Sequence, residues 1–159
     1  MDQNADAVRV WFRMIRLTTR IRVEIAARLR RFDLSLPQCD VLSTLSEKEG
    51  ISQQELARKL YVTKGNISGL IDRLAESGLV ERRSIDGDRR SHALFLTDAG
   101  RALAQAGIAA QLEFVAQSFG RIDAARLADL EALLIEARDH VRSSVEQHAT
   151  RSDLVAEAA

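Results

Sequence analysis

The sequence predicts a mostly α-helical (α+β) fold that contains one small β-hairpin. Proline occurs once, at Pro37, and only eight of the 159 residues are glycine, so few positions interrupt a helix. Apolar residues recur at helical spacing along most of the chain, whereas the alternation typical of strands is confined to residues 79–96. These observations favour helices arranged around a single hairpin.

Residues 6–32 predict one long helix with two apolar faces. Its apolar residues are Val8, Trp11, Phe12 and Ile15 on one face, and Met14, Leu17, Ile21, Ile25 and Leu29 on the other. A helix that is apolar on two sides must be covered on two sides. We expect the chain's own core to cover one face and a second subunit to cover the other.

Start and stop signals then delimit three shorter helices. Proline fits the first turn of a helix, so one helix begins at Pro37. Ser52 and Glu55 have the spacing of a capping box, in which each side chain accepts a hydrogen bond from a backbone N–H group at the start of the next helix. Thr63 is a suitable N-cap for the third helix, and Gly78 ends it.

Two strand-like runs follow, Leu79–Ile85 and His92–Leu96, with a turn at Asp86-Gly87. Two short helices joined by a tight turn and followed by a hairpin make a winged helix-turn-helix. We therefore predict a DNA-binding lobe over 36–97 with a two-stranded β-wing.

The rest of the chain predicts two further helices. Thr97 caps one that runs to about Phe119, and Asp123 caps the last. Segments 6–35 and 98–148 are predicted to form long terminal helices, and 149–159 a frayed tail.

Composition excludes several classes of protein. No apolar run is long enough to cross a membrane, and the N-terminus lacks a signal-peptide pattern, so we expect a cytoplasmic protein without a membrane partner. The single cysteine and the three scattered histidines predict no metal or other cofactor. Because the chain shows no nucleophile beside a base and no phosphate-binding loop, we expect no enzyme.

Formal net charge is zero, so binding of nucleic acid requires locally placed positive charge. The third short helix places small or polar residues on its exposed N-terminal face: Thr63, Lys64, Gly65, Asn66 and Ser68. Lysine reaches guanine or phosphate, and asparagine pairs with the adenine edge. These residues predict contacts in the major groove of DNA, although capping alone explains Thr63 equally well.

The segments LARKLYVTKGNISGLIDRLAESGLVERR and DGDRRSHALFLTDAG resemble the MarR family of bacterial transcriptional regulators. The likeness covers roughly residues 8–147, and its most specific part is the wing signature of Asp88, Arg90, Thr97 and Gly100. The resemblance implies a homodimer that binds a pseudo-palindromic double-stranded DNA operator. It implies further that the N- and C-terminal helices, over 6–35 and 98–148, intertwine as dimerisation helices. It also implies repression that a small aromatic or phenolic ligand relieves.

The wing supplies further candidates for DNA contact. We expect Arg90 to enter the minor groove and Arg89 to contact phosphates, although a solvated hairpin tip explains Arg89 equally well. The resemblance implies that Asp88 orients the wing through an ion pair, for which Arg73 is the proposed partner.

The resemblance places an effector pocket between the terminal helices and the DNA-binding lobe. Its walls would include Trp11, Ile15, Arg16, Arg20 and Cys39. An arginine there could hold a carboxylate, but the arginine spacing also fits a solvated helix face. Redox sensing through Cys39 is the alternative function. The sequence gives no sign of the access or the lowered pKa that a reactive thiol needs, so a buried structural role is the simpler interpretation.

Alanine substitutions at the wing separate groove binding from phosphate binding. Arg90→Ala should weaken binding most at sites with a narrow A·T minor groove, whereas Arg89→Ala should weaken all duplexes alike and reduce the salt dependence. Titration of A·T-rich and G·C-rich duplexes at several salt concentrations measures both effects. Equal losses from the two variants would show that the groove assignment is wrong.

Overall fold

The computed structural model describes the backbone of residues 3–85 and 88–157 and the side chains of residues 4–63, 65–84 and 92–148. The chain divides into two compact units, Met1–Phe114 and Val115–Ala159. None of the described helices has the length and apolar character needed to cross a bilayer.

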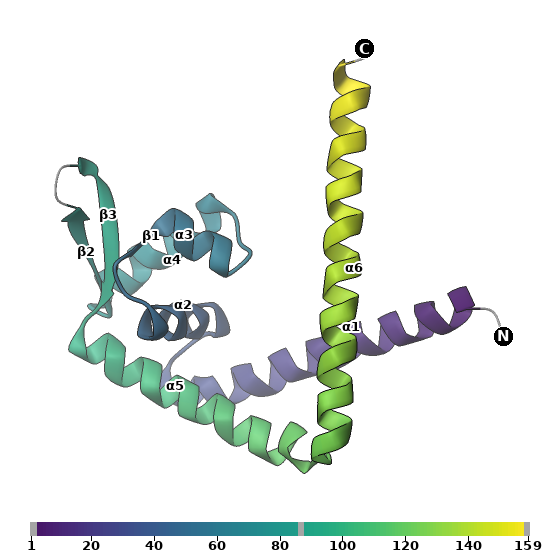
Figure 1. Ribbon diagram of the computed structural model, residues 1–159. Coiled ribbons are helices and arrows are strands. Elements are labelled where there is room, and N and C mark those ends of the chain that lie inside the picture. The colour runs from purple at the N-terminus through teal and green to yellow at the C-terminus, as the bar shows by residue number, and fades with distance from the viewer. Residues whose placement is uncertain (1–2, 86–87, 158–159) are drawn as a thin grey trace. The chain divides into compact units, whose positions relative to one another are not determined.

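The first unit carries the predicted lobe (Figure 1). Its elements are α1 (Gln3–Leu29), the 3-10 helix η1 (Arg30–Phe32), α2 (Leu36–Glu47), β1 (Ile51–Ser52), α3 (Gln53–Lys59), α4 (Lys64–Glu76), β2 (Val80–Ile85), β3 (Asp88–Leu96) and most of α5 (Asp98–Gln117). The second unit continues with η2 (Phe119–Arg121) and α6 (Ala124–Glu157). The mostly helical fold predicted from the sequence is confirmed.

The core of the first unit lies where α2, α3 and α4 pack against each other and against the sheet. Its fully buried side chains include Leu29, Cys39, Val41, Leu42, Leu45, Leu56, Ile71, Leu74 and Leu94. The inward-facing residues that the sequence indicated for α4, namely Ile67, Leu70, Ile71 and Leu74, are all buried. Burying one face of α4 fixes the direction of its opposite face.

The sheet has three antiparallel strands in the order β1-β3-β2. The sequence predicted β2 and β3 but not β1, which pairs Ile51 with Leu94 and Ser52 with Ala93. Two residues are too few to show an alternating pattern, so this strand carries no periodic signal. β3 also begins at Asp88, four residues before the predicted start. The predicted turn at Asp86-Gly87 lies outside the described residues.

The predicted capping box at Ser52 is only half formed. Ser52 Oγ accepts a hydrogen bond from Glu55 N at 3.1 Å, as predicted. The Glu55 carboxylate, however, pairs with Lys48 Nζ at 3.3 Å, because a cation within reach competes for it. The complete capping box lies instead at the start of α2, between Ser35 and Gln38.

Three helices of the first unit end in the same Schellman motif, whose last residue has a left-handed backbone. The residue in that position is Asp33 after η1, Tyr61 after α3 and Gly78 after α4, with φ of 53°, 53° and 68°. Glycine adopts this conformation without strain, as the sequence indicated for Gly78. For most residues with a Cβ, such as tyrosine, the conformation costs roughly 1–2 kcal/mol, and it costs less for aspartate.

The terminal helices differ from the sequence-based expectations in two ways. The structure buries only the C-terminal end of α1, at Leu29, while Ile25 packs against the core and both apolar faces nearer the N-terminus are exposed. In the second unit, α6 continues to Glu157 through most of the predicted tail at 149–159. No glycine or proline follows Gly120, so no residue favours an earlier end to the helix. Fraying of its last turns stays a prediction.

Candidate nucleic-acid interface

The N-terminal end of α4 presents the predicted recognition residues to solvent. Thr63 is the N-cap, and its Oγ1 accepts a hydrogen bond from Asn66 N at 3.3 Å. Gly65 and Asn66 are exposed and Ser68 is half-buried, whereas the Lys64 side chain lies outside the described residues. A Cβ on Gly65 would meet no atom within 4 Å, so this face is open to a close approach.

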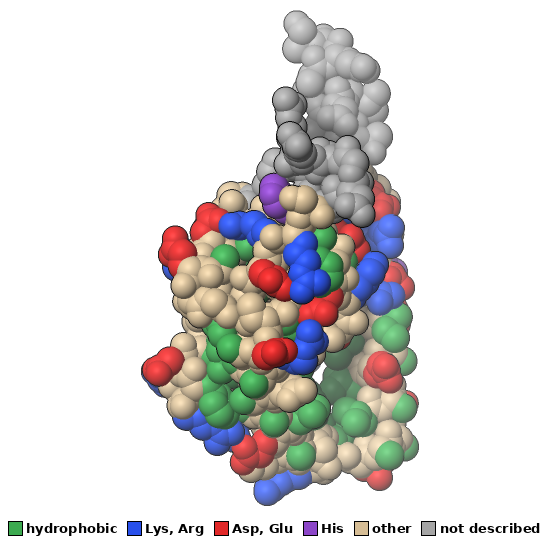
Figure 2. All heavy atoms as spheres, turned by 90° about the vertical axis from the view of Figure 1, so that its left-hand side faces the viewer, with side chains coloured by type: hydrophobic (Ala, Val, Ile, Leu, Met, Phe, Trp, Pro, Cys, Tyr) green, Lys and Arg blue, Asp and Glu red, His purple; other side chains and the backbone are tan. Residues whose placement is uncertain are grey.

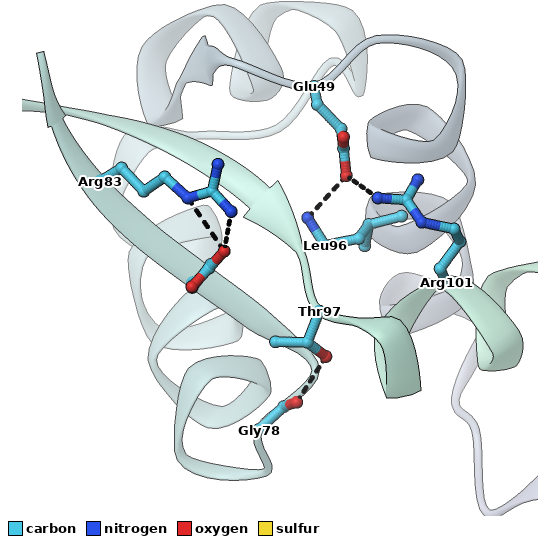
Figure 3. Close-up of polar contacts among 7 residues, drawn as sticks. Glu49, Gly78, Arg83, Leu96, Thr97 and Arg101 are labelled. Carbon is cyan, nitrogen blue, oxygen red and sulfur yellow. Dashed lines mark hydrogen bonds and ion pairs between the residues drawn. The ribbon is translucent and has the colours of Figure 1, made fainter.

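A hydrogen-bonded junction fixes the wing to α5 (Figure 3). Thr97 Oγ1 donates to Gly78 O at 2.7 Å and accepts from Gly100 N at 3.0 Å. Glu49 Oε1 accepts from Leu96 N and from Arg101 Nη2, each at 2.9 Å. The last residue of β3 is thereby tied to the loop after α2 and to the first turns of α5.

The wing arginines at positions 82 and 83 lie on opposite faces of β2, as strand alternation requires. Arg82 forms an ion pair with Asp72 of α4. Arg83 forms one with Glu81, at 2.9 Å from its Nε, and its guanidinium lies 4.2 Å from the centre of the Phe95 ring. Both cations are therefore already neutralised within the lobe. The sequence showed no sign of the Asp72–Arg82 pair, because the two residues come from different elements.

The remaining wing predictions lie outside what the structure describes. The side chains of Asp88, Arg89 and Arg90 are not among the described ones, so the proposed Asp88–Arg73 ion pair stays a prediction. Arg73 itself is exposed on α4. Over the face that carries β2 and β3, described acidic and basic side chains are intermixed (Figure 2). This mixture agrees with the zero net charge of the chain. Affinity for DNA would therefore depend on a few individual side chains and not on a broadly basic surface.

A pocket of about 400 Å³ opens beside α4. Its lining comes from α1, α2, α4 and the turn between α3 and α4: Arg22, Pro37, Asp40, Leu60, Val62, Asn66, Ile67, Leu70 and Arg73. Burial raises the pKa of the Asp40 carboxyl, and the nearby Arg22 charge partly offsets that effect. Two guanidinium groups and an apolar floor suit a flat molecule that carries a negative charge.

None of the five residues proposed for the effector pocket lines this cavity. Trp11, Ile15, Arg16 and Arg20 are exposed on α1, and Cys39 is fully buried in the core. The structure thus does not gather the five into one site within a single subunit. Sequence reasoning missed Arg22 and Asp40, which come together only because α1 and α2 pack against each other.

Cys39 is enclosed by the core rather than exposed. Its Sγ lies 3.8 Å from Ser43 Oγ and accepts a hydrogen bond from Gln111 Nε2 at 3.4 Å. A Cβ on Gly107 would come within 2.8 Å of the sulfur, so α5 packs closely over it. Burial is the main cause that raises the pKa of the Cys39 thiol, which keeps the thiol protonated at neutral pH.

Known proteins resemble this chain in sequence and in fold. The sequence profile of the MarR family matches residues 34–92. An uncharacterized HTH-type transcriptional regulator of Bacillus cereus is 33% identical over 75% of this chain and 79% of its own. The HTH-type transcriptional repressor Mb2911 of Mycobacterium bovis is 30% identical over 82% of this chain and 94% of its own.

Solved structures agree with these relatives. The Mycobacterium tuberculosis MarR family protein Rv2887 has a TM-score of 0.62 and 28% identity, over 79% of this chain and 91% of its own. Rv2887 has also been solved in complexes with DNA and with salicylic acid. The MarR family regulator SP03579, at 22% identity over 91% of this chain and 94% of its own, shares the fold with a TM-score of 0.79. The chain therefore belongs to the MarR family of DNA-binding helix-turn-helix transcriptional regulators.

Proposed function

We propose that the protein is a homodimeric repressor that binds a pseudo-palindromic operator and releases it when a small aromatic acid binds. One observation carries the DNA-binding part of this proposal. The core buries one face of α4 and leaves Thr63, Gly65 and Asn66 exposed at its N-terminus, with the wing held beside it. Two such helices related by a dimer axis would enter major grooves about 34 Å apart.

The exposed apolar residues of α1 support the dimer. The large apolar side chains that α1 leaves exposed are Val8, Val10, Trp11, Phe12, Met14, Ile15, Leu17 and Val23. In the second unit, α6 likewise exposes Leu133, Leu134, Val141 and Val145. Apolar surface of this extent is typical of an interface, and a second copy of the chain would cover it.

The pocket beside α4 supports the choice of an aromatic acid as ligand. A carboxylate could pair with Arg22 or Arg73 while the ring lies on Ile67 and Leu70. Since Asn66 and Arg73 belong to the recognition helix, a ligand there would act on the DNA-reading element directly. Rv2887 binds salicylic acid, and Mb2911 is a repressor, which agrees with this proposal. Couplings of this kind are typically about 1–3 kcal/mol.

The rival function, redox sensing through Cys39, has no support from the site. A sensing thiol needs access and a lowered pKa. Cys39 has no exposed surface and a raised pKa. We therefore keep the ligand-controlled repressor as the proposed function.

Asn66→Ala tests the reading of the operator by α4. Removing a bidentate contact to adenine should cost about 1–3 kcal/mol of operator affinity and relax the preference at that position. The measurement is titration of a duplex that the purified protein selects from a random pool. Ser46→Ala, at an exposed position on α2, is the control and should change nothing. An unchanged affinity for Asn66→Ala would contradict the placement of α4 in the groove.

Arg22→Ala tests the pocket. Salicylate should weaken operator binding by the wild-type protein, and the variant should need roughly ten- to hundredfold more salicylate, because hydrogen bonds to charged groups contribute about 1.5–3 kcal/mol. Calorimetry with salicylate and operator titration in its presence give both numbers. Arg13→Ala, exposed on the same helix, is the matched control. If neither salicylate nor other aromatic carboxylates change operator affinity, the ligand proposal is wrong.

Cys39→Ser separates the rival functions. Peroxide should affect operator binding by the variant and the wild-type protein equally, since the native thiol is buried and protonated. A raised native pKa also means that deprotonation favours the unfolded chain, so stability should fall as pH rises above the ordinary thiol range. Denaturation between pH 7 and pH 10 measures that loss, which Cys39→Ser should reduce. A peroxide response that disappears in the variant would restore the redox alternative.

A further inference from the structure

Tyr61 combines backbone strain with almost complete exposure. Its φ is 53°, in the left-handed region, and 96% of the residue's surface is exposed. The hydrogen bonds that impose this conformation run from Tyr61 N to Arg58 O at 3.3 Å and from Val62 N to Ala57 O at 3.0 Å. These are the bonds of the Schellman motif that ends α3.

The other helix of the helix-turn-helix shows what the motif itself requires. After α4 the same two bonds form, and the left-handed residue is Gly78, which has no Cβ to strain. At Tyr61 a large aromatic side chain occupies the equivalent position without packing against the fold. Strain that the folded chain does not recover through packing points to a role outside it.

The position of Tyr61 suggests that role. It lies in the turn between α3 and α4, two residues before the N-cap Thr63, so its Cα is within about 7 Å of the start of the recognition helix. In helix-turn-helix proteins the first helix crosses the DNA backbone while the N-terminus of the second contacts bases. The turn between the two helices therefore lies at the edge of the groove, where the phosphates are.

Two cations accompany the ring. Arg58 and Lys59 form the last turn of α3 and are exposed, and neither is ion-paired within the described part of the chain. They differ in this from Arg82 and Arg83, whose charges are already neutralised. The turn thus carries a phenol and two uncommitted positive charges within four residues.

We propose that Tyr61 contacts the sugar-phosphate backbone at the edge of the major groove, with Lys59 and Arg58 on neighbouring phosphates. The phenol O–H donates a hydrogen bond to a phosphate oxygen, and the ring lies on the adjacent deoxyribose. Such a contact sets the position of α4 and reads no base. This inference rests on the proposed placement of α4 in the groove.

Tyr61→Gly should make the protein more stable and a weaker DNA binder. Removing the Cβ relieves strain and should raise Tm by about 2–4 °C at a fixed protein concentration. Losing the phenol should weaken binding roughly tenfold, equally for the selected operator duplex and for a mixed-sequence duplex. Asp33→Gly is the matched control, since Asp33 has the same φ of 53° after η1. It should raise Tm by less than Tyr61→Gly does, because aspartate adopts the left-handed conformation more readily than tyrosine, and it should leave affinity unchanged.

Two further variants test the chemistry. Tyr61→Phe keeps the ring and the strain, so Tm should stay the same while affinity falls by a smaller factor than in Tyr61→Gly. Lys59→Ala should reduce the slope of log affinity against log salt by about 0.9, whereas the Tyr61 variants should leave the slope unchanged because the phenol carries no charge.

The proposal is overturned if Tyr61→Gly binds both duplexes as tightly as the wild type does. It is also overturned if the variant loses stability, which would show that the ring supports the fold, or if it loses affinity only for the operator, which would indicate base reading. Asn66→Ala distinguishes this failure from failure of the proposed function. If Asn66→Ala weakens operator binding while Tyr61→Gly does not, α4 lies in the groove and only the contact by the turn is wrong.

Discussion

A Cβ on residue 100 would overlap the carbonyl oxygen of Leu79, so α5 can begin where it does only because that residue is glycine. This backbone-to-backbone approach places Thr97 where its hydroxyl bonds both Gly78 O and Gly100 N. Glu49 adds a third link, from the loop after α2 to β3 and α5. These hydrogen bonds consequently hold together the end of α4, the base of the wing and the start of α5. The spacing between α4 and the wing depends on these contacts.

Signals that lie close together in the sequence predicted the helices and strands of the winged helix-turn-helix well. Thr63 and Gly78 mark the two ends of α4 by cap chemistry, and the apolar spacing between them identifies its buried face. Contacts between segments that are distant in the sequence could not be predicted from such local signals. β1 is two residues long, and Asp72 meets Arg82 only because β2 returns along α4. The pocket beside α4 likewise requires Arg22 and Asp40 from separate helices, and no periodic pattern indicates that they meet.

The apolar pattern of α1 predicts more burial than a single subunit provides. The pattern correctly indicated a helix with apolar residues on two sides, but only Leu29 of that set is fully buried within the chain. The remaining apolar surface is stable in water only when something covers it. For a dimeric protein, folding of this helix and association of subunits are therefore one equilibrium, and measured stability depends on protein concentration.

Ion pairs inside the lobe also affect how the protein searches a genome. Arg82 and Arg83 are paired with Asp72 and Glu81, so they add little net positive charge to the lobe, and binding to arbitrary DNA should release fewer counterions than the arginine count suggests. Weak binding to non-cognate DNA shortens the residence time at each site. The protein then slides only short distances along the duplex and dissociates and rebinds often. A regulator of this kind loses fewer copies to the excess of competing sites. A small number of molecules per cell can then keep an operator occupied.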